Sequence, residues 1–458
     1  STRVNPIDWS KVVPIEGDMR SENLGLSDVM LDRVSSSVHI IINNAASVKF
    51  DATLKNNLSD NYLGTRTLLN MATKFKQLIS FVHISTFYSN SSHGGDSHIE
   101  EKVMPLKCDC EKMAELISWV PEPVLETLGP QLMENRLNTY IFTKAMTEDL
   151  IQRFQGLLPL AIVRPSIVVP SLKEPEPGWV DSINGPMGLG VLGALGIARN
   201  DDWNIDGMSD LVPVDTVVNS ILAVAERTPR LYPKEIKVYN CSSSSLCPIN
   251  WTKALLKMQE VALKSPPYKM LRIPVPVPET RVPSSKIRLA YAKLSETLFA
   301  CFVDLILFIC GQKPILRKIT AKLHNAYEIL TPFNTISFTC TNDNLMAAIE
   351  ELHDDDKLEF DFNVKDIDWD EYLRNTWYGV RKRLIREDLS NVQAALIKMR
   401  ILAAIEFLVK TAFYCYIGWH CYSFLISWFN PDLEYSQLHH ETTSAGPSAP
   451  TPAIVQNI

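Results

Sequence analysis

Short apolar runs rich in β-branched residues alternate with longer segments of helical periodicity through the first third of the chain. The runs are Val12 to Ile15, Val38 to Ile42, Ile79 to Ile84 and Leu160 to Val163. Runs this short that are apolar on both faces are typical of strands buried in a parallel sheet. Parallel strands joined by helices predict an α/β, Rossmann-like fold with a doubly wound parallel sheet.

Two intervening segments, Asn57 to Lys74 and Leu137 to Phe154, have apolar residues at the spacing of amphipathic helices. The second contains Tyr140 and Lys144, which lie on one helix face about one turn apart. There an ammonium group can lower the pKa of a phenol, and the phenol can give a proton to a carbonyl oxygen as hydride reaches the carbon. The spacing alone is weak evidence, because it often arises by chance.

The run Ile79 to Ile84 ends in two hydroxyl residues, Ser85 and Thr86. Ligands of doubly wound sheets bind at the carboxyl ends of the strands. A hydroxyl there can bind a substrate carbonyl, and the alternative is that both residues only open a loop. The pairing with Tyr140 and Lys144 favours a catalytic role.

Changes in composition along the chain indicate domain boundaries. Prolines cluster from Pro266 onward, after which helical patterns replace the alternation, so we expect a Rossmann-like domain over 1–265 and a mainly helical domain over 266–400. Residues 430–458 are rich in Pro, Ser and Thr and contain no Lys or Arg, which predicts a disordered tail.

A membrane-associated helix is expected over 401–429. Thr411 to Phe429 is a run of 19 residues without Asp, Glu, Lys or Arg, barely long enough to span a bilayer, and basic residues stand only on its N-terminal side. This predicts a membrane-attached protein with a cytosol-facing catalytic domain, on the endoplasmic reticulum or alternatively the peroxisome. The competing interpretation is an interfacial helix, favoured by its Tyr, Trp and His residues. The run Leu298 to Cys310 is interrupted by Asp304 and is too short to span, which favours a buried helix or part of the wall of an apolar binding site.

Charge and cysteine content argue against a nucleic-acid partner and against a metal site. The chain has 45 basic and 52 acidic residues and no basic stripe, so nucleic acid is not an expected partner. Its nine cysteines lack zinc-site spacing, so no metal is expected and a reducing, cytosol-facing environment is favoured.

Several further motifs make the chain similar to the alcohol-forming fatty acyl-CoA reductases of the extended short-chain dehydrogenase/reductase superfamily. They are Pro14–Asp18, Asn23–Leu26, Asn44–Ala46, Asn61–Thr65, Val82–Thr86, Asn138–Lys144, Arg164–Val168, Glu176–Trp179 and Pro213–Asp215. Ile367–Trp369, Tyr372 and Gly379–Arg381 resemble the C-terminal domain of the family, so the resemblance covers nearly the whole chain.

The resemblance implies that NADPH reduces a long-chain fatty acyl-CoA by two hydride transfers, through an aldehyde, to a fatty alcohol with release of CoA. Tyr140 would donate the proton, and Lys144 would lower its pKa and hold the nicotinamide ribose. Thr86 or Ser85 would bind the carbonyl oxygen or the developing oxyanion, and Thr86 aligns better with the catalytic position of the superfamily.

The resemblance also implies cofactor contacts. They are Asp18 with the adenine, Asn44, Ala45 and Ala46 with the dinucleotide beyond the next strand, and Arg164, Pro165 and Ser166 beside the nicotinamide. Competing interpretations are that Asp18 caps a helix and that the two alanines are small packing residues.

The family begins with a strand and a Gly-rich turn whose amides hold the pyrophosphate, and neither precedes Ser1. We therefore expect an N-terminally truncated chain that lacks the first strands and does not bind NADPH productively by itself. The alternatives to an acyl-CoA reductase are a sterol or other lipid dehydrogenase of the same superfamily, a nucleotide-sugar enzyme, and a catalytically silent, truncated membrane protein.

Overall fold

The computed structural model describes residues 8–429 except 92–96, 135, 200–206, 278–285 and 336. The chain divides into two compact units, Ser1–Leu396 and Ile397–Ile458. The first unit contains the sheet and most helices, and the second contains most of one long helix, so they are described separately. The domain boundary expected near residue 266 falls inside the first unit and stays a prediction.

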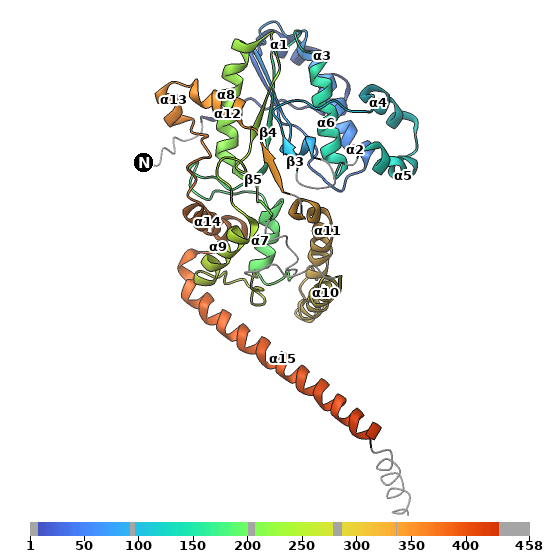
Figure 1. Cartoon of the computed structure of the whole chain (residues 1–458), viewed down its shortest axis with the longest axis vertical. Coiled ribbons are helices and arrows are strands. Elements are labelled where there is room, and N and C mark those ends of the chain that lie inside the picture. The colour runs from blue at the N-terminus through green and yellow to red at the C-terminus, as the bar shows by residue number, and fades with distance from the viewer. Residues whose placement is uncertain are drawn as a thin grey trace, which may run out of the picture. The chain divides into compact units, whose positions relative to one another are not determined.

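A four-stranded parallel sheet forms the centre of the first unit (Figure 1). Its strands are β1 (Ile40–Asn43), β2 (Ser80–Ile84), β4 (Leu160–Pro165) and β7 (Lys237–Cys241), in the order β1-β2-β4-β7. Register is regular, with Val82 opposite both Ile42 and Ala161. These strands confirm three of the four predicted ones and the expected parallel α/β architecture.

The sheet has an apolar core on each face. On one face, Val82 and Val163 pack against Val224 of α8 (Val214–Leu231). On the other, Phe81 and Ile162 pack against helices that include α3 (Gly64–Ala72) and α6 (Thr139–Gln152). Side chains alternate between the two faces of a strand, and all five residues of β2 are buried because both of its faces are covered.

The predicted strand at Val12 to Ile15 is wrong. These residues are extended without strand pairing, and Val12, Val13 and Ile15 are 54%, 60% and 45% exposed. No described strand pairs with them. A strand requires a neighbour for its backbone groups, so apolar composition alone does not make one.

The other elements of the first unit complete the body. Two small parallel pairs join β3 (Ser97–Ile99) to β8 (Phe338–Cys340) and β5 (Ile167–Val169) to β6 (Leu211–Pro213). The N-terminal helical elements are η1 (Trp9–Lys11), η2 (Glu22–Gly25), α1 (Asp28–Ser37), α2 (Leu54–Asn57), the π-helix η3 (Leu58–Leu63), η4 (Phe87–Asn90), α4 (Cys110–Trp119) and α5 (Glu122–Leu132). The later ones are α7 (Pro186–Ala194), α9 (Trp251–Lys264), α10 (Lys286–Ile309), α11 (Leu316–Thr335), α12 (Asp343–Glu350), α13 (Asp354–Glu359), α14 (Trp369–Gly379), η5 (Val380–Ile385) and η6 (Leu389–Asn391).

The helical region packs directly on the loop that follows β5. The Tyr372 hydroxyl donates to the Pro170 carbonyl at 2.6 Å, and Arg383 forms an ion pair with Glu176 at 2.6 Å. Gly178 and Gly379 approach so closely that a methyl group on Gly379 would overlap the Gly178 carbonyl. Gly178 also has φ of +78°, a conformation that favours glycine.

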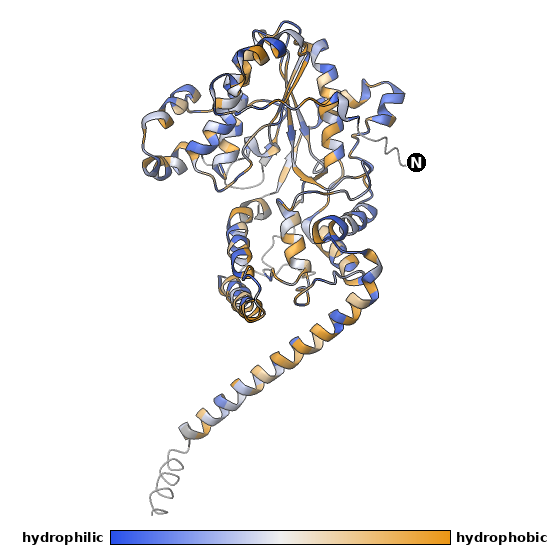
Figure 2. Cartoon of the chain, turned by 180° about the vertical axis from the view of Figure 1, so that it is seen from behind, coloured by the Kyte–Doolittle hydropathy of each residue, from blue (hydrophilic) through white to orange (hydrophobic). Residues whose placement is uncertain are grey.

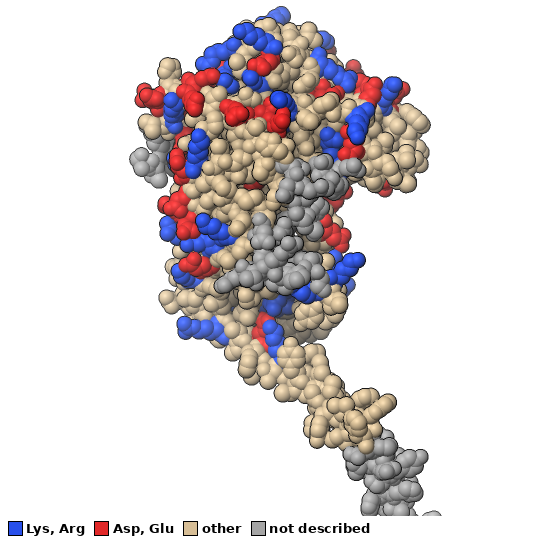
Figure 3. All heavy atoms as spheres, viewed as in Figure 1, with Lys and Arg blue, Asp and Glu red and all other residues tan. Residues whose placement is uncertain are grey.

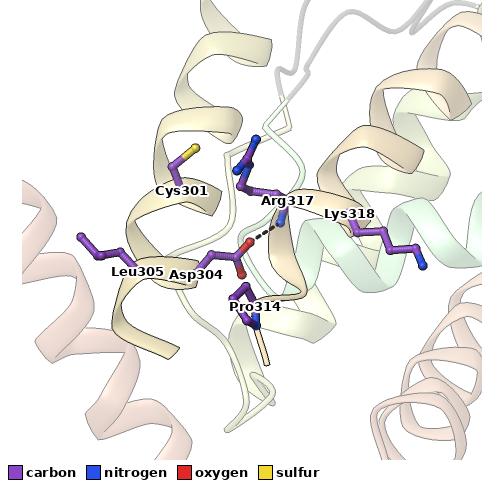
Figure 4. A pocket seen from close by; sticks show the side chains of 6 residues that line it. All are labelled: Cys301, Asp304, Leu305, Pro314, Arg317 and Lys318. Atoms are coloured by element: carbon purple, nitrogen blue, oxygen red, sulfur yellow. Dashed lines mark hydrogen bonds between the residues drawn. The ribbon is translucent and has the colours of Figure 1, made fainter. Parts of the chain in front are cut away.

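Helix α10 is only half buried. Ala300 and Asp304 face the interior, whereas Leu298, Phe302 and Leu305 are exposed. The run Leu298 to Cys310 is therefore not the fully buried helix that its composition favoured. Beside it lies an open depression of about 610 Å³, which Figure 4 shows between Cys301 and Lys318. Asp304 accepts the amides of Ile315, Leu316 and Arg317 there at 2.8–3.0 Å, so this carboxylate caps the start of α11.

Helix α15 (Val392–Phe429) contains 38 residues and supplies the described part of the second unit. Apolar residues follow one another along it (Figure 2), and those from Phe413 to Trp428 include exposed Tyr and Trp side chains. Among the described residues, no helix combines the length and apolarity that crossing a membrane requires. Figure 3 shows few charged residues on α15 and interspersed acidic and basic residues on the body.

Candidate active site

The predicted site residues gather at the carboxyl edge of the sheet. Asn44 follows β1, Ser85 and Thr86 follow β2, and Ser166 follows β4. Because the three strands are parallel and adjacent, their carboxyl ends lie at one edge. This is the edge where doubly wound sheets bind ligands.

Tyr140 lies in the first turn of α6. The Asn138 side chain caps this helix by accepting the Ile141 amide at 2.9 Å, which fixes the turn that carries the phenol. The Tyr140 ring packs on Phe50, with ring centroids 5.3 Å apart. Burial raises the pKa of Tyr140 to about 12, and a hydrogen bond with the Thr86 side chain acts in the opposite direction.

Lys144 is buried one turn further along α6, and its Nζ donates to the Ile84 carbonyl at 2.7 Å. Burial lowers the pKa of Lys144 to about 8, although the Glu148 carboxylate favours the charged amine. The expectation that Lys144 lowers the pKa of Tyr140 is not met in this structure, because burial of the phenol dominates. The lysine instead joins α6 to the end of β2.

Ser85 and Thr86 have different partners. Ser85 Oγ donates to Glu148 Oε1 at 2.5 Å, and Ser89 Oγ donates to the same oxygen at 2.9 Å. Successive residues of an extended chain point to opposite sides, so Thr86 is directed toward Tyr140 while Ser85 enters a buried network. This geometry favours Thr86 for contact with a substrate carbonyl.

Arg164 belongs to the same buried network rather than to an open cofactor site. It pairs with Glu148 at 2.5 Å, and it donates to the carbonyls of Glu100 at 3.0 Å and Lys102 at 2.8 Å. All three of its nitrogens are used, as a fully buried cation requires. The Arg164 side chain therefore serves this buried network, and the place of Arg164 beside the nicotinamide stays a prediction.

The other predicted cofactor residues lie in loops. Asn44 and Ala45 are exposed and Ala46 is half-buried after β1. Pro165 ends β4, and the Ser166 amide donates to the Cys241 carbonyl at 3.0 Å. Their cofactor contacts stay predictions.

Asp18 is exposed, and its carboxylate accepts the Arg20 amide at 2.9 Å. It therefore stabilises a local turn and does not cap a helix, because the N-cap of the following element η2 is Ser21. Its contact with an adenine stays a prediction.

Glu148 and Asn61 support the site. Asn61 opens the motif Asn61–Thr65, whereas no sequence pattern singled out Glu148. Asn61 accepts the Ser47 amide at 2.7 Å and donates to Thr143 at 3.0 Å, which ties the loop after β1 to α6. Glu148 stands four residues after Lys144, on the same helix face. That spacing is the signal that could have identified it.

The nicotinamide and ribose end of a dinucleotide fits these residues. Thr86 and Tyr140 supply hydroxyls, and a lysine ammonium has three donors, of which Ile84 takes one. The described strands have no Gly-rich turn at their carboxyl ends, so the described residues do not supply a pyrophosphate cradle. No cluster of His, Cys, Asp and Glu suited to a metal occurs among them either.

A parallel sheet with Thr86, Tyr140 and Lys144 at its carboxyl edge defines a nicotinamide-dependent oxidoreductase. Two family models, both described as male sterility protein, match the chain: an NAD-binding domain over residues 3–221 and a second domain over 295–387. Fatty acyl-CoA reductase 1 of Rattus norvegicus is 34% identical over 392 residues, which are 85% of this chain and 75% of the relative. Fatty acyl-CoA reductase 2 of Mus musculus is 34% identical over 90% of this chain and 79% of its own length. The chain belongs to the fatty acyl-CoA reductase family.

The fold is also similar to a solved structure, the terminal R domain of the myxalamid biosynthetic pathway. The TM-score is 0.55 at 17% identity, over 81% of this chain and 76% of that one. At this identity the likeness concerns the fold alone, a Rossmann-like sheet with a helical C-terminal region.

Proposed function

We propose that this protein reduces long-chain fatty acyl-CoA to fatty alcohol with NADPH, through an aldehyde. The observation that carries the proposal is the meeting of Thr86, Tyr140 and Lys144 at the carboxyl edge of the sheet. When bound, NADPH supplies one hydride for each of the two reductions. The products are the alcohol, free CoA and two oxidised cofactors, and two protons are consumed.

The phenol is suited to act as the acid. Because burial raises its pKa to about 12, Tyr140 keeps its proton at neutral pH until a substrate oxygen becomes more basic. The Thr86 hydroxyl would hold the same oxygen. A charged Lys144, with a pKa of about 8, is a stronger acid than the phenol and would return a proton to it after each reduction.

The direct test is a product assay. The full-length natural protein, with any residues that precede Ser1, would be purified and incubated with hexadecanoyl-CoA and either NADPH or NADH, and hexadecanol and hexadecanal would be measured by mass spectrometry. We expect the alcohol with NADPH. Tyr140→Phe should lower its formation by about 10² to 10⁴, the usual contribution of general acid catalysis, while the fold is retained.

A matched control is Tyr62→Phe, which also removes a buried phenol, one that is bonded to Glu111 at 2.9 Å and to none of Thr86, Tyr140 and Lys144. It should leave turnover near the wild-type value. Absence of alcohol from the wild-type protein, or full turnover by Tyr140→Phe, would refute the proposal. Oxidation of a sterol instead would support the lipid dehydrogenase alternative.

We further propose that the protein attaches to a membrane lipid surface through α15. Its support is the exposure of large apolar and aromatic side chains along the helix, including Phe413, Trp419 and Trp428. Tyr and Trp favour the headgroup level, where an apolar helix can lie without crossing. The cytosolic face of the endoplasmic reticulum, or of the peroxisome, is the site that we propose.

A further inference from the structure

An apolar cavity of about 190 Å³ lies in the helical part of the first unit. It is enclosed by α7, α9, α11, α14 and the segment 274–277, and Figure 1 shows α7 between α9 and α11. Residues that line it include Leu189, Gly193, Trp251, Met258, Val275 and Tyr327. None of these residues has a role in the proposed chemistry.

Two polar side chains that border the cavity are bonded to their neighbours. Gln259 donates to the Val275 carbonyl at 3.4 Å and accepts the Val277 amide at 3.1 Å, which holds the segment 274–277 on α9. The Tyr327 hydroxyl donates to Glu296 at 2.9 Å. Most of the lining is hydrocarbon, so we expect a ligand of this cavity to be mainly hydrocarbon as well.

Helix α11 connects the cavity to the catalytic tyrosine. Tyr327 lines the cavity, Leu330 packs in the apolar clusters of both regions, and Phe333 stacks on Phe50 at 5.5 Å. Phe50 in turn packs on Tyr140. Phe333 stands six positions after Tyr327 on this helix, which is a rise of about 9 Å. A continuous row of apolar side chains therefore leads from the reacting groups to the cavity.

The size of the cavity sets what it can hold. An apolar cavity of ~150 Å³ accepts benzene, so 190 Å³ corresponds to about seven carbon atoms. This is too small for a whole long acyl chain and is suited to the end of one. We propose that the cavity binds the methyl end of the acyl chain and thereby sets chain-length preference. The inference rests on the proposed acyl-CoA reductase function.

Two glycines allow the cavity to be narrowed without moving the backbone. A Cβ atom at Gly190 or Gly193 would meet no atom within 4 Å, whereas one at Gly188 of the same helix would overlap the Ile183 carbonyl. Gly193→Leu would therefore place a side chain in the cavity. Met258→Ala would enlarge it from the opposite wall.

The experiment compares kcat/KM for acyl-CoA esters of 8 to 20 carbons in wild type, Gly193→Leu and Met258→Ala. Each methylene group that leaves water for an apolar site strengthens binding roughly fourfold. Gly193→Leu should therefore lower kcat/KM for the longest efficient substrates by about 10- to 100-fold and spare shorter ones. Met258→Ala should shift the optimum toward longer chains. The control Gly129→Leu, at a position in α5 that lines no part of the cavity and whose Cβ also meets no atom within 4 Å, should keep the wild-type profile.

A second readout does not depend on turnover. Hexadecanoyl-CoA should raise the Tm of wild type more than that of Gly193→Leu. Unchanged profiles in both cavity variants, or equal losses at every chain length, would overturn the inference while the reductase activity stood. A wild-type protein that reduces no acyl-CoA would instead refute the proposed function, and the inference would fall with it.

Discussion

Ser85 and Thr86 are adjacent in the chain, yet replacing them should affect different properties. Thr86→Ala removes the hydroxyl beside Tyr140 and should lower turnover about 10- to 100-fold with little change in stability. Ser85→Ala removes a partner of the buried Glu148 carboxylate and should lower the free energy of unfolding by ~1.5 to 3 kcal/mol. Steady-state kinetics and urea unfolding of both variants would test this. The reverse pattern would assign the catalytic role to Ser85.

The lowered pKa of Lys144 leads us to expect that the stability of the protein depends on pH. Its pKa is lowered to about 8 by burial, against 10.5 for an unperturbed lysine. Between these values the unfolded chain binds more protons than the folded one, so the free energy of unfolding should rise with pH from 8 to 10, by about 2 to 3 kcal/mol. Above pH 10 the raised pKa of Tyr140 acts in the opposite sense.

Urea unfolding between pH 8 and 10 would measure the rise, with Lys144→Met as the matched control. The methionine keeps most of the side-chain volume and does not titrate, so the difference between the two proteins isolates the amine. Parallel curves for wild type and Lys144→Met would show that Lys144 is not a buried, titrating amine.

At the level of helices and strands, β1, β2 and β4 could be predicted because both faces of each run are apolar. The run Val12 to Ile15 has the same local composition and is exposed, because pairing depends on neighbours that composition does not specify. Strand β7 includes Lys237 and Asn240, so a search for apolar runs does not identify it.

The sequence predicted the candidate site only in part, as it did the strands. The spacing on α6 located Tyr140 and Lys144. Separating Thr86 from Ser85, and recognising Arg164 as part of a buried ion pair, required the position of Glu148 in three dimensions.

If α15 attaches the protein to membranes, removing its aromatic segment should abolish the attachment. Deleting residues 411–458 should release it from phosphatidylcholine vesicles in a flotation assay, because the exposed aromatic residues leave with the helix. Deleting only 430–458 keeps α15 and should preserve binding. Continued flotation of the larger deletion would point instead to α10, where Leu298, Phe302 and Leu305 are exposed.

Across the whole first unit, stability should depend on the contact between Gly178 and Gly379. Gly379→Ala would place a methyl group on the Gly178 carbonyl, and overpacking of this kind costs ~1 to 3 kcal/mol or more. We expect a Tm lower by several degrees. Gly190→Ala, in open space on a helix, should be neutral or stabilising by ~0.5 to 1 kcal/mol. Equal melting of both variants would show that the two segments separate readily.

The pairing of β3 with β8 has a consequence for the growing chain on the ribosome. His98 and Thr339, which pair across these strands, are 241 residues apart. At a synthesis rate of ~5 to 20 residues per second, β3 waits about 10 to 50 seconds for its partner. The Glu100 carbonyl just beyond β3 accepts a hydrogen bond from Arg164, so this bond also involves a segment that β8 does not yet hold in place. The nascent protein therefore exposes an unpaired strand and an unfinished core while it is still being made, which is when binding by a chaperone would prevent aggregation.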